Sequence, residues 1–344
     1  MENERLNTTS VSALIHAYKT RVMELNGVAP DIDGQFNVTP AIEQKLENKI
    51  RENADFLGRI NIVGVRDLVG DKVSIDVTGP IAGRTNTDEN DRQTQDNLAL
   101  DERRYQCEKT EFDTHIKWNT LDTWSSQPDF QKRITAAVTR QIARDRMTIG
   151  FNGIEAAAVT NKAENPLLED VNIGWLEHIK TARPEAHMEN LQIGQGGDFK
   201  NLDAAVYAAR HELLAPWHRN DTSLVAIMGS GLLVDKNVAA IEAHDAPTER
   251  AALQTLMLKN LIGTLQPAIV PFFPADAILI TTYENLSIYY QKGTRRRHIK
   301  DNPKRDRLED YQTVNEAYVV EDYDKCALLT GIQNLAAAPA EEAA

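Results

Sequence analysis

The sequence predicts a chain of mixed helices and strands, organised as two or three packed units. Apolar residues at helical spacing recur in the first half of the chain, and β-rich aromatic runs fill residues 271–329. A long polar segment without periodicity interrupts the first half at residues 83–96. A chain of 344 residues is too long for one small core, and its 42% hydrophobic content is ample for a folded interior.

The N-terminus predicts a helix that stands apart from the body of the protein. Its apolar residues follow helical spacing up to Gly27, and they are Val11, Leu14, Ile15, Tyr18, Val22 and Leu25. Residues 28–38 show no periodicity, and a second helix is expected to start at Thr39, with Pro40 in its first turn. A helix on such a linker is typical of a detachable or partner-binding arm.

Two helices are predicted between residue 39 and residue 150. The first carries the apolar stripe Ile42, Leu46, Ile50, Ala54 and Leu57 before Gly58. The second opens after Pro128, ends near Gly150, and has the apolar face Phe130, Ile134, Ala137, Val138 and Ile142. Its basic residues are expected to face solvent or partners, and they are Lys132, Arg133, Arg140, Arg144 and Arg146.

The polar segment is acidic and lies between short β-like runs at 73–77 and 105–107. Long loops without structure of their own are uncommon in compact domains. Two interpretations stay open, which are a disordered surface loop and an extended hairpin that becomes ordered only against a neighbouring subunit. A hairpin of two strands is marginal by itself, because it has no third strand to pack on.

The remainder of the chain alternates between strands and helices. Strands are expected at 224–228, 268–270, 277–281, 286–290, 317–320 and 326–332, and helices at 202–214, 232–242 and 248–259. The residues from 333 onward are too simple in composition to fold alone.

Charge and composition exclude several classes of protein. The net charge of -13 argues against a nucleic-acid binder, whose affinity comes mainly from Lys and Arg that neutralise phosphates. No apolar run approaches the ~20 residues that span a bilayer, and the N-terminus lacks the features of a signal peptide. Cys107 and Cys326 lie far apart, which favours free thiols over a disulfide. A protein made and used in cytoplasm is therefore expected.

No catalytic, metal-binding or cofactor-binding set is evident in the sequence. None of the 8 histidines forms HExxH or pairs with a cysteine at zinc spacing. The glycine-rich stretches 194–199 and 229–231 lack the residues that complete a nucleotide-binding loop, so tight turns are expected there. We therefore expect neither an enzyme nor a cofactor.

A basic cluster near the end of the chain stands out from the acidic background. It consists of Lys292, Arg295, Arg296, Arg297, Lys300, Lys304, Arg305 and Arg307. Intersubunit ion pairing, a solvated loop and DNA contact are the three interpretations. Pairing between subunits is favoured, because patches of opposite sign on one molecule suit self-assembly. The expected contacts join surface residues Arg295, Arg296, Arg297, Lys304 and Arg305 to Asp88, Glu89 and Asp91 of a neighbour.

Short segments spread over residues 11–332 match one known family in a single order. They are ELNGV (24–28), NADFLGRINIV (53–63), VTGPIA (77–82), GFNG (150–153), NPLLEDVNIGWL (165–176), GQGGDFKNLDA (194–204) and the run 271–329. With these segments the chain resembles the major capsid proteins of tailed, contractile-tail, temperate bacteriophages. The resemblance implies an α+β subunit of the HK97 type, with an N-terminal arm, an extended hairpin loop, a peripheral domain with a long spine helix, and an axial domain.

The resemblance also implies a division of the chain. The expected parts are an N-terminal helix and linker (1–38), an arm helix (39–62), the hairpin region (63–112), the peripheral domain (113–200, spine helix about 128–150), a mainly axial part (201–310), return strands of the peripheral domain (311–332) and a disordered tail (333–344).

The function that the resemblance implies is structural. Such a protein assembles as pentamers and hexamers into an icosahedral virion head, in the host cytoplasm, around double-stranded DNA that it does not read. A scaffold, a head protease, a portal and decoration proteins are implied partners, and a membrane is not. Trimming of the N-terminal segment is implied near Phe36 and Asn37. The alternatives are the shell of a bacterial enzyme compartment and an enzyme of unfamiliar fold.

Overall fold

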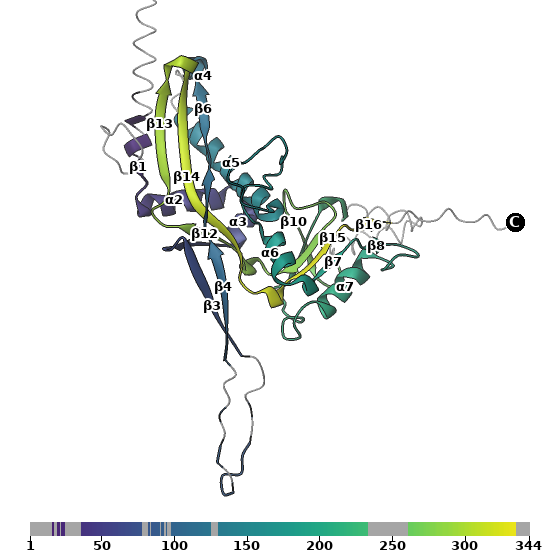
Figure 1. Ribbon diagram of the computed structural model, residues 1–344. Coiled ribbons are helices and arrows are strands. Elements are labelled where there is room, and N and C mark those ends of the chain that lie inside the picture. The colour runs from purple at the N-terminus through teal and green to yellow at the C-terminus, as the bar shows by residue number, and fades with distance from the viewer. Residues whose placement is uncertain are drawn as a thin grey trace, which may run out of the picture.

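The computed structural model describes residues 36–77, 98–124, 130–232 and 261–334, with scattered positions in 16–24 and 82–94. The helices expected before Gly27, at 232–242 and at 248–259 lie almost entirely outside the described residues, as does the tail from 335. The described chain forms two main sheets, each with its own helices, and a long hairpin (Figure 1).

The larger sheet is built around one long strand, β14 (Arg307–Val320). The first half of β14 lies between β13 (Arg296–Asn302) on one side and β6 (Thr114–Lys117) and β5 (Glu108–Glu111) on the other. Its second half pairs with β12 (Leu286–Gln291). The outer strands are β1 (Phe36–Asn37), beside β13, and β2 (Asn61–Val65), beside β12.

Helices cover this sheet and supply half of its core. They are α2 (Pro40–Glu52), α3 (Asp55–Arg59), α4 (Trp118–Trp124), α5 (Phe130–Asn152) and α6 (Trp175–Ala182). Apolar side chains of α2, α3, α5 and α6 meet those of β12 and β14 in one buried cluster. The long helix expected at about 128–150 is confirmed as α5, and α2 begins at Pro40 after Thr39, as predicted.

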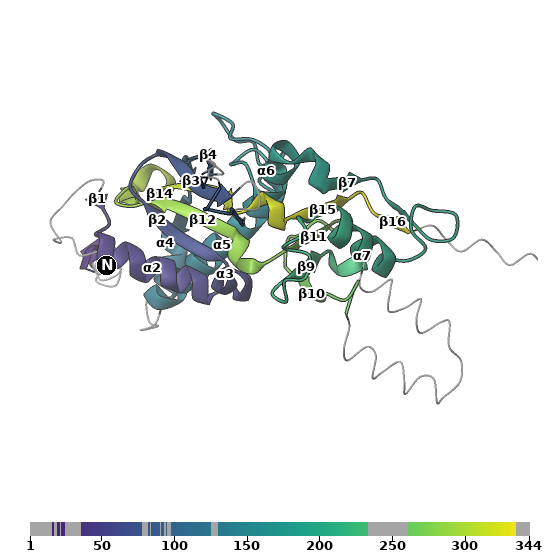
Figure 2. The same ribbon diagram turned by 90° about the horizontal axis from the view of Figure 1, so that it is seen from below.

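The smaller sheet has the strand order β10-β9-β11-β15-β7. Its strands are β7 (His187–Glu189), β9 (Val225–Met228), β10 (Gln266–Ile269), β11 (Ile278–Thr281) and β15 (Ala327–Thr330). Helix α7 (Leu202–Glu212) packs its apolar face against this sheet, and Asn201 caps its first turn by accepting a hydrogen bond from the Ala204 N–H. A short pair, β8 (Gln192–Ile193) with β16 (Gln333–Asn334), extends this end of the molecule (Figure 1), where Figure 2 also labels β16.

The boundaries between the two sheets differ from the expected division into a mainly axial part (201–310) and return strands of the peripheral domain (311–332). β12 and β13 precede residue 310 yet belong to the larger sheet, because both pair along β14. β15 follows β14 but pairs with β11 of the smaller sheet. The chain therefore crosses between the sheets immediately before β12 and immediately after β14.

A two-stranded hairpin leaves the larger sheet and points away from the body (Figure 1). Its strands are β3 (Val69–Val77) and β4 (Leu98–Gln106), which pair in antiparallel register from Val69↔Gln106 to Val77↔Leu98. An ion pair of 3.1 Å between Lys72 Nζ and Glu321 Oε2 anchors the base, and the Arg103 guanidinium lies 4.2 Å from the centroid of the Tyr323 ring. The expected extended hairpin is confirmed in these described strands.

The contact between α5 and α6 depends on a glycine. A Cβ atom added at Gly150 would lie 2.2 Å from the Trp175 ring, far inside van der Waals contact. Trp175 is fully buried, and its indole N–H donates a hydrogen bond of 2.9 Å to the Ser287 carbonyl on β12. Because this hydrogen bond and complete burial hold the ring in place, the ring cannot move away from an added methyl group without a loss of contacts.

We expect Gly150→Ala to lower the free energy of unfolding by about 1–3 kcal/mol, because the added methyl group overpacks a rigid contact. Gly58→Ala is the matched control: Gly58 is also helical, and nothing lies within 4 Å of an added Cβ there. The control should be neutral or stabilising by up to ~1 kcal/mol, from helix propensity. Urea unfolding of the unassembled subunit measures both, and equal effects of the two changes would contradict the packing described.

Candidate assembly surface

The basic cluster of the sequence lies on the hairpin formed by β13, the turn at residues 303–305 and the first half of β14. Its members differ in environment. Arg296, Lys304 and Arg305 are exposed, whereas Arg295 is only 2% exposed. Arg297 is partly buried, and its guanidinium donates hydrogen bonds of 2.9 and 2.6 Å to the Asp310 carboxylate on the neighbouring strand. The expectation that the whole cluster is exposed is therefore wrong for Arg295.

Arg295 belongs to a buried charge cluster beneath the sheet, whose centre is Arg146 of α5. Arg146 is fully buried, and it donates hydrogen bonds of 2.6 and 3.0 Å to the Glu47 carboxylate of α2. It also donates bonds of 2.5 to 3.2 Å to the Glu316 carboxylate of β14. Arg295 Nη2 adds a bond of 2.5 Å to Glu47 Oε1. These charge-assisted bonds tie α2, α5 and the sheet to one another.

The electrostatics of Glu47 follow from this geometry. Burial favours the neutral carboxyl group, but the positive charges of Arg146 and Arg295 outweigh burial and lower the pKa of Glu47. The same pairing raises the pKa of Arg146 against the opposing effect of its burial. Glu47 and Arg146 are therefore both charged at neutral pH.

Glu43 lies one turn before Glu47 and is also buried, but its pairing is incomplete. Its Oε2 accepts a hydrogen bond of 3.1 Å from the Gly293 N–H, while Oε1 has no hydrogen-bond partner among the described residues. Burial raises the pKa of Glu43 above its ordinary value, although the Gly293 N–H and Arg295 act in the opposite direction. The pKa values of Glu43 and Glu47, which lie on the same helix, are thus shifted in opposite directions.

The sequence pattern did not identify this cluster. Arg146 was expected to face solvent or partners, and that expectation is wrong, because the side chain is fully buried. One signal was available: Arg146 follows Ile142 by four residues and so lies on the same apolar stripe of α5. In α2, Glu43 and Glu47 each follow an apolar stripe residue, Ile42 and Leu46, but nothing local identifies their partners.

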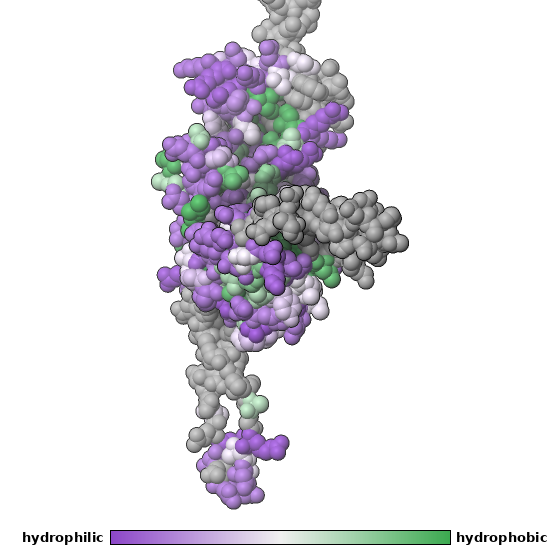
Figure 3. All heavy atoms as spheres, turned by 90° about the vertical axis from the view of Figure 1, so that its right-hand side faces the viewer, coloured by the Kyte–Doolittle hydropathy of each residue, from purple (hydrophilic) through white to green (hydrophobic). Residues whose placement is uncertain are grey.

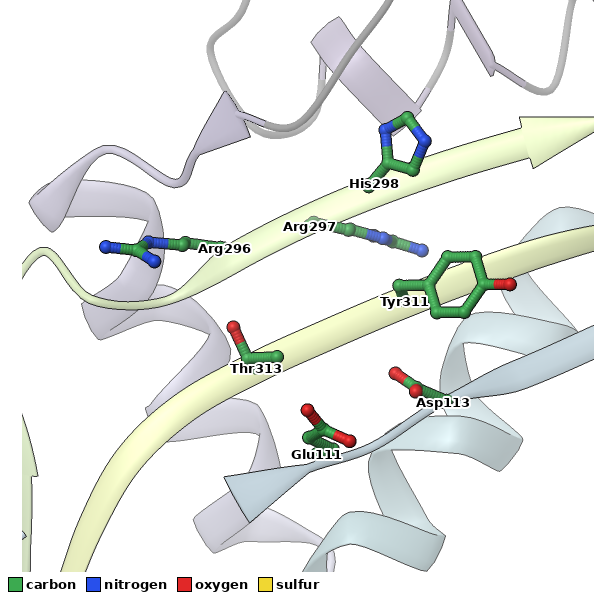
Figure 4. Close-up of a pocket in the computed structure, with 7 residues that line it drawn as sticks. All are labelled: Glu111, Asp113, Arg296, Arg297, His298, Tyr311 and Thr313. Atoms are coloured by element: carbon green, nitrogen blue, oxygen red, sulfur yellow. The ribbon is translucent and has the colours of Figure 1, made fainter. Parts of the chain in front are cut away.

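A shallow hollow of about 360 Å³ lies on the larger sheet, among residues of the strands β13 and β14 and the chain at β5 (Figure 4). Its lining residues are Glu111, Asp113, Arg296, Arg297, His298, Tyr311 and Thr313. The rings of His298 and Tyr311 stack with centroids 6.3 Å apart, and the Tyr311 hydroxyl donates a bond of 2.7 Å to Glu309. That bond is the main reason that the pKa of Glu309 falls to about 2. The hollow presents acids and bases together, which suits ion pairing with another polar surface.

The acidic residues of the expected contacts are exposed and lie far from the basic hairpin. Asp88, Glu89 and Asp91 belong to the described positions beyond β3. The hairpin strands point in one direction and the turn between β13 and β14 lies at the opposite end of the molecule (Figure 1). Within one subunit the two groups are therefore not brought together, and any pairing between them requires a second copy.

The residues of the expected trimming site form a strand. Phe36 and Asn37 make up β1 and pair with Arg297 and Arg296 of β13. The next residue, Val38, is 2% exposed, and its N–H donates a bond of 3.0 Å to the Arg295 carbonyl. A protease needs extended, accessible backbone, so cleavage at Phe36–Asn37 requires β1 to leave β13 first.

Neither a metal site nor a membrane-spanning helix occurs in the part of the chain that the structure describes. No group of three or more His, Cys, Asp or Glu side chains there could hold a metal ion. Within the same residues, no helix is long and apolar enough to cross a membrane. Both cysteines are buried and free. One face of the molecule is mainly hydrophilic, with apolar side chains in small separate groups (Figure 3).

The buried cluster generates a pH-dependent prediction. The lowered pKa of Glu47 means that its pairing stabilises the fold above the ordinary glutamate value of 4.5, and that this contribution is lost as pH falls through the folded-state pKa. The raised pKa of Glu43 means the reverse: its contribution is present below 4.5 and is lost as pH rises through the folded-state pKa.

We therefore expect Glu47→Gln to cost about 3–5 kcal/mol at pH 7, because it breaks a buried ion pair. Glu43→Gln should be neutral or stabilising at pH 7, since the amide oxygen still accepts the Gly293 bond without a buried charge. The effect of Glu47→Gln should shrink on acidification. Urea unfolding of both variants from pH 8 down to about pH 3, well below the ordinary value of 4.5, tests this. Similar losses for both at pH 7 would show that Glu43 is a paired anion.

Comparison with known proteins agrees with the fold. Residues 14–332 match the family model described as phage major capsid protein, P2 family. The chain is 40% identical to the capsid proteins of Escherichia phage P2 over 332 residues, which cover 92% of this chain and 93% of that protein. It is 39% identical to the major capsid protein of Serratia phage KSP20, with coverage of 93% and 95%.

Solved structures give the same result. A chain of the satellite phage P4 procapsid that includes the size determination (Sid) protein matches with a TM-score of 0.78 and 39% identity, covering 87% of this chain and 93% of that chain. The capsid of the empty GTA particle matches with a TM-score of 0.52 at 15% identity, over 81% and 89% of the two chains, which shows the fold alone. The expected α+β capsid fold of the HK97 type is thus confirmed. The chain belongs to the P2 family of phage major capsid proteins.

Proposed function

We propose that this chain is the shell-forming subunit of a phage head. Many copies, arranged as pentamers and hexamers, close into an icosahedral shell around double-stranded DNA that the subunit does not read. The observation that carries the proposal is the family match over residues 14–332, which includes both sheets and the hairpin. A bacterial compartment shell and an enzyme are the alternatives, and the family match favours neither of them.

The test is the behaviour of the purified full-length protein. On size-exclusion chromatography and negative-stain imaging, we expect closed shells of uniform size, or capsomers that convert to shells when assembly conditions are varied. A stable monomer or dimer under all conditions would overturn the proposal. Shells isolated from phage-producing cells should contain DNA, and shells that contain only protein cargo would favour the compartment alternative.

The charge distribution supports contacts between copies. Each subunit carries exposed acidic residues beyond β3 and exposed basic residues at the opposite end of the larger sheet. Complementary charges of this kind set the register of association more than its strength. We propose that Arg296, Lys304 and Arg305 face Asp88, Glu89 and Asp91 of a neighbour, whereas Arg295 and Arg297 serve inside the subunit, with Glu47 and Asp310.

Reversing Arg296, Lys304 and Arg305 to Glu should block shell formation while the subunit stays folded, because exposed charges contribute little to stability. Reversing Asp88, Glu89 and Asp91 to Lys should block it as well. A protein that carries both sets of changes should recover assembly in part. Light scattering during assembly measures each case, and wild-type assembly should weaken as salt rises. Normal assembly of the basic-to-Glu variant would leave a solvated loop as the better account.

Further partners are proposed from the resemblance to the family. They are a scaffold, a head protease, a portal and decoration proteins, which would act with the shell during its formation. The N-terminal segment before β1 would then be a temporary assembly element, removed near Phe36 and Asn37. Support comes from the unpatterned linker at residues 28–38, which joins the predicted N-terminal helix to the body.

Intact mass spectrometry of subunits from infectious particles tests the trimming. We expect a subunit that lacks about the first three dozen residues, since the short strand β1 has to give up only its pairing with β13 before this backbone can enter a protease cleft. Subunits produced without other phage proteins are the control and should keep their full mass. A full-length mass in infectious particles would show that the N-terminal helix is a permanent arm.

A further inference from the structure

The exposed face of α5 is basic, although the chain as a whole has a net charge of -13. Arg133, Arg140 and Arg144 are exposed, and their spacing of seven and four residues places them on one side of the helix. With a rise of ~1.5 Å per residue, the three positions span about 16 Å along the axis. A line of guanidinium groups therefore follows the long helix.

Two of these arginines open on a hollow of about 700 Å³ between α5, α3 and β10. Arg59 of α3 lines the same hollow, held by an ion pair of 2.8 Å to Asp55 and by the Tyr283 ring, whose centroid lies 5.2 Å from its guanidinium carbon. Asp55 is the one acidic residue among the described lining residues, and it is committed to Arg59. Among the described residues, no carboxylate forms an ion pair with Arg140 or Arg144.

This face differs from the basic hairpin. There, Arg297 and Arg307 are paired with Asp310 and Glu309 of their own subunit. On α5, the guanidinium groups of Arg140 and Arg144 are left available to an anion from outside the subunit. Guanidinium forms paired hydrogen bonds to phosphate, and its charge persists at any physiological pH.

We propose that the face formed by Arg59, Arg140 and Arg144 is a phosphate-binding surface for the backbone of the enclosed DNA. The proposal rests on the proposed function, because the shell defines which polyanion is present. The axial spacing of ~6 Å between Arg140 and Arg144 is close to two phosphate steps of one strand, which advance ~3.4 Å each along the duplex axis. Contacts to phosphates alone position the polymer without reading its sequence.

The contact has to be short-ranged and salt-sensitive. The negative charge of the whole subunit repels DNA at a distance, and the arginine face attracts it at close range. Such weak binding lets DNA move along the wall while it is packed and released. A local basic face of this kind allows a subunit with a negative net charge to contact nucleic acid directly.

The test measures binding of a fluorescent 20-bp DNA duplex to unassembled full-length subunits by fluorescence anisotropy at low salt. Arg140→Gln with Arg144→Gln should weaken binding by at least about tenfold and reduce the slope of log affinity against log salt by about 2. Lys45→Gln with Lys49→Gln is the matched control, another exposed pair of cations four residues apart on a helix. The control should bind within about twofold of the wild type. Arg140→Lys with Arg144→Lys should keep most of the binding, which separates charge from folding.

Several outcomes overturn the proposal. They are failure of the wild type to bind DNA, equal binding by the Arg→Gln variant and its control, and tighter binding of poly-glutamate than of DNA through the same arginines. The last result would identify a docking site for acidic protein. Imaging of shells from the same preparations tests the proposed function separately, since shells that form without DNA affinity would refute this inference alone.

Discussion

The buried charge cluster around Arg146 is the constraint on which the larger sheet and its helices depend. It joins Glu47 of α2, Arg146 of α5 and Glu316 of β14 with Arg295, which lies immediately before β13. An apolar contact tolerates small shifts of one element along another. A guanidinium held by two carboxylates does not, because every bond is directional and a lost bond leaves a charge without compensation in the interior. The cluster therefore sets how α2 lies relative to α5 and β14.

This constraint also decides which cations the subunit can offer to a neighbour. Arg295 and Arg146 neutralise carboxylates in the interior, so neither is available at the surface. The exposed cations fall into two groups with different surroundings. Those of the basic hairpin lie among carboxylates of the same sheet, in a surface of mixed charge, while those of α5 face a hollow whose single described carboxylate is already paired. A surface of mixed charge suits protein contacts, and one of a single sign suits a polyanion.

Local pattern predicted the elements whose apolar residues have a clear period, such as α2, α5 and β11. It found only the last residues of β14, 317–320, because the inward positions before them are polar. Glu309, Asp310, Gln312 and Glu316 are all buried there, where an apolar alternation would have marked a strand. The burial of Arg295 was beyond local reasoning, since its partner Glu47 lies 248 residues away. Family resemblance gave the fold, and side-chain geometry was needed to separate interior from surface charge.

The contacts of Lys72 and Arg103 fix the angle at which the hairpin leaves the body of the subunit. Its base is fastened at residues 320–323, where the chain leaves β14 and turns toward the smaller sheet. A nine-residue strand reaches about 30 Å at ~3.3 Å per residue, so a tilt of about 10° at the base displaces its far end by about 5 Å. That distance is about one strand spacing. Any contact that the far end makes with a neighbouring subunit therefore depends on the angle at the base, and the junction that fixes this angle also joins the two sheets.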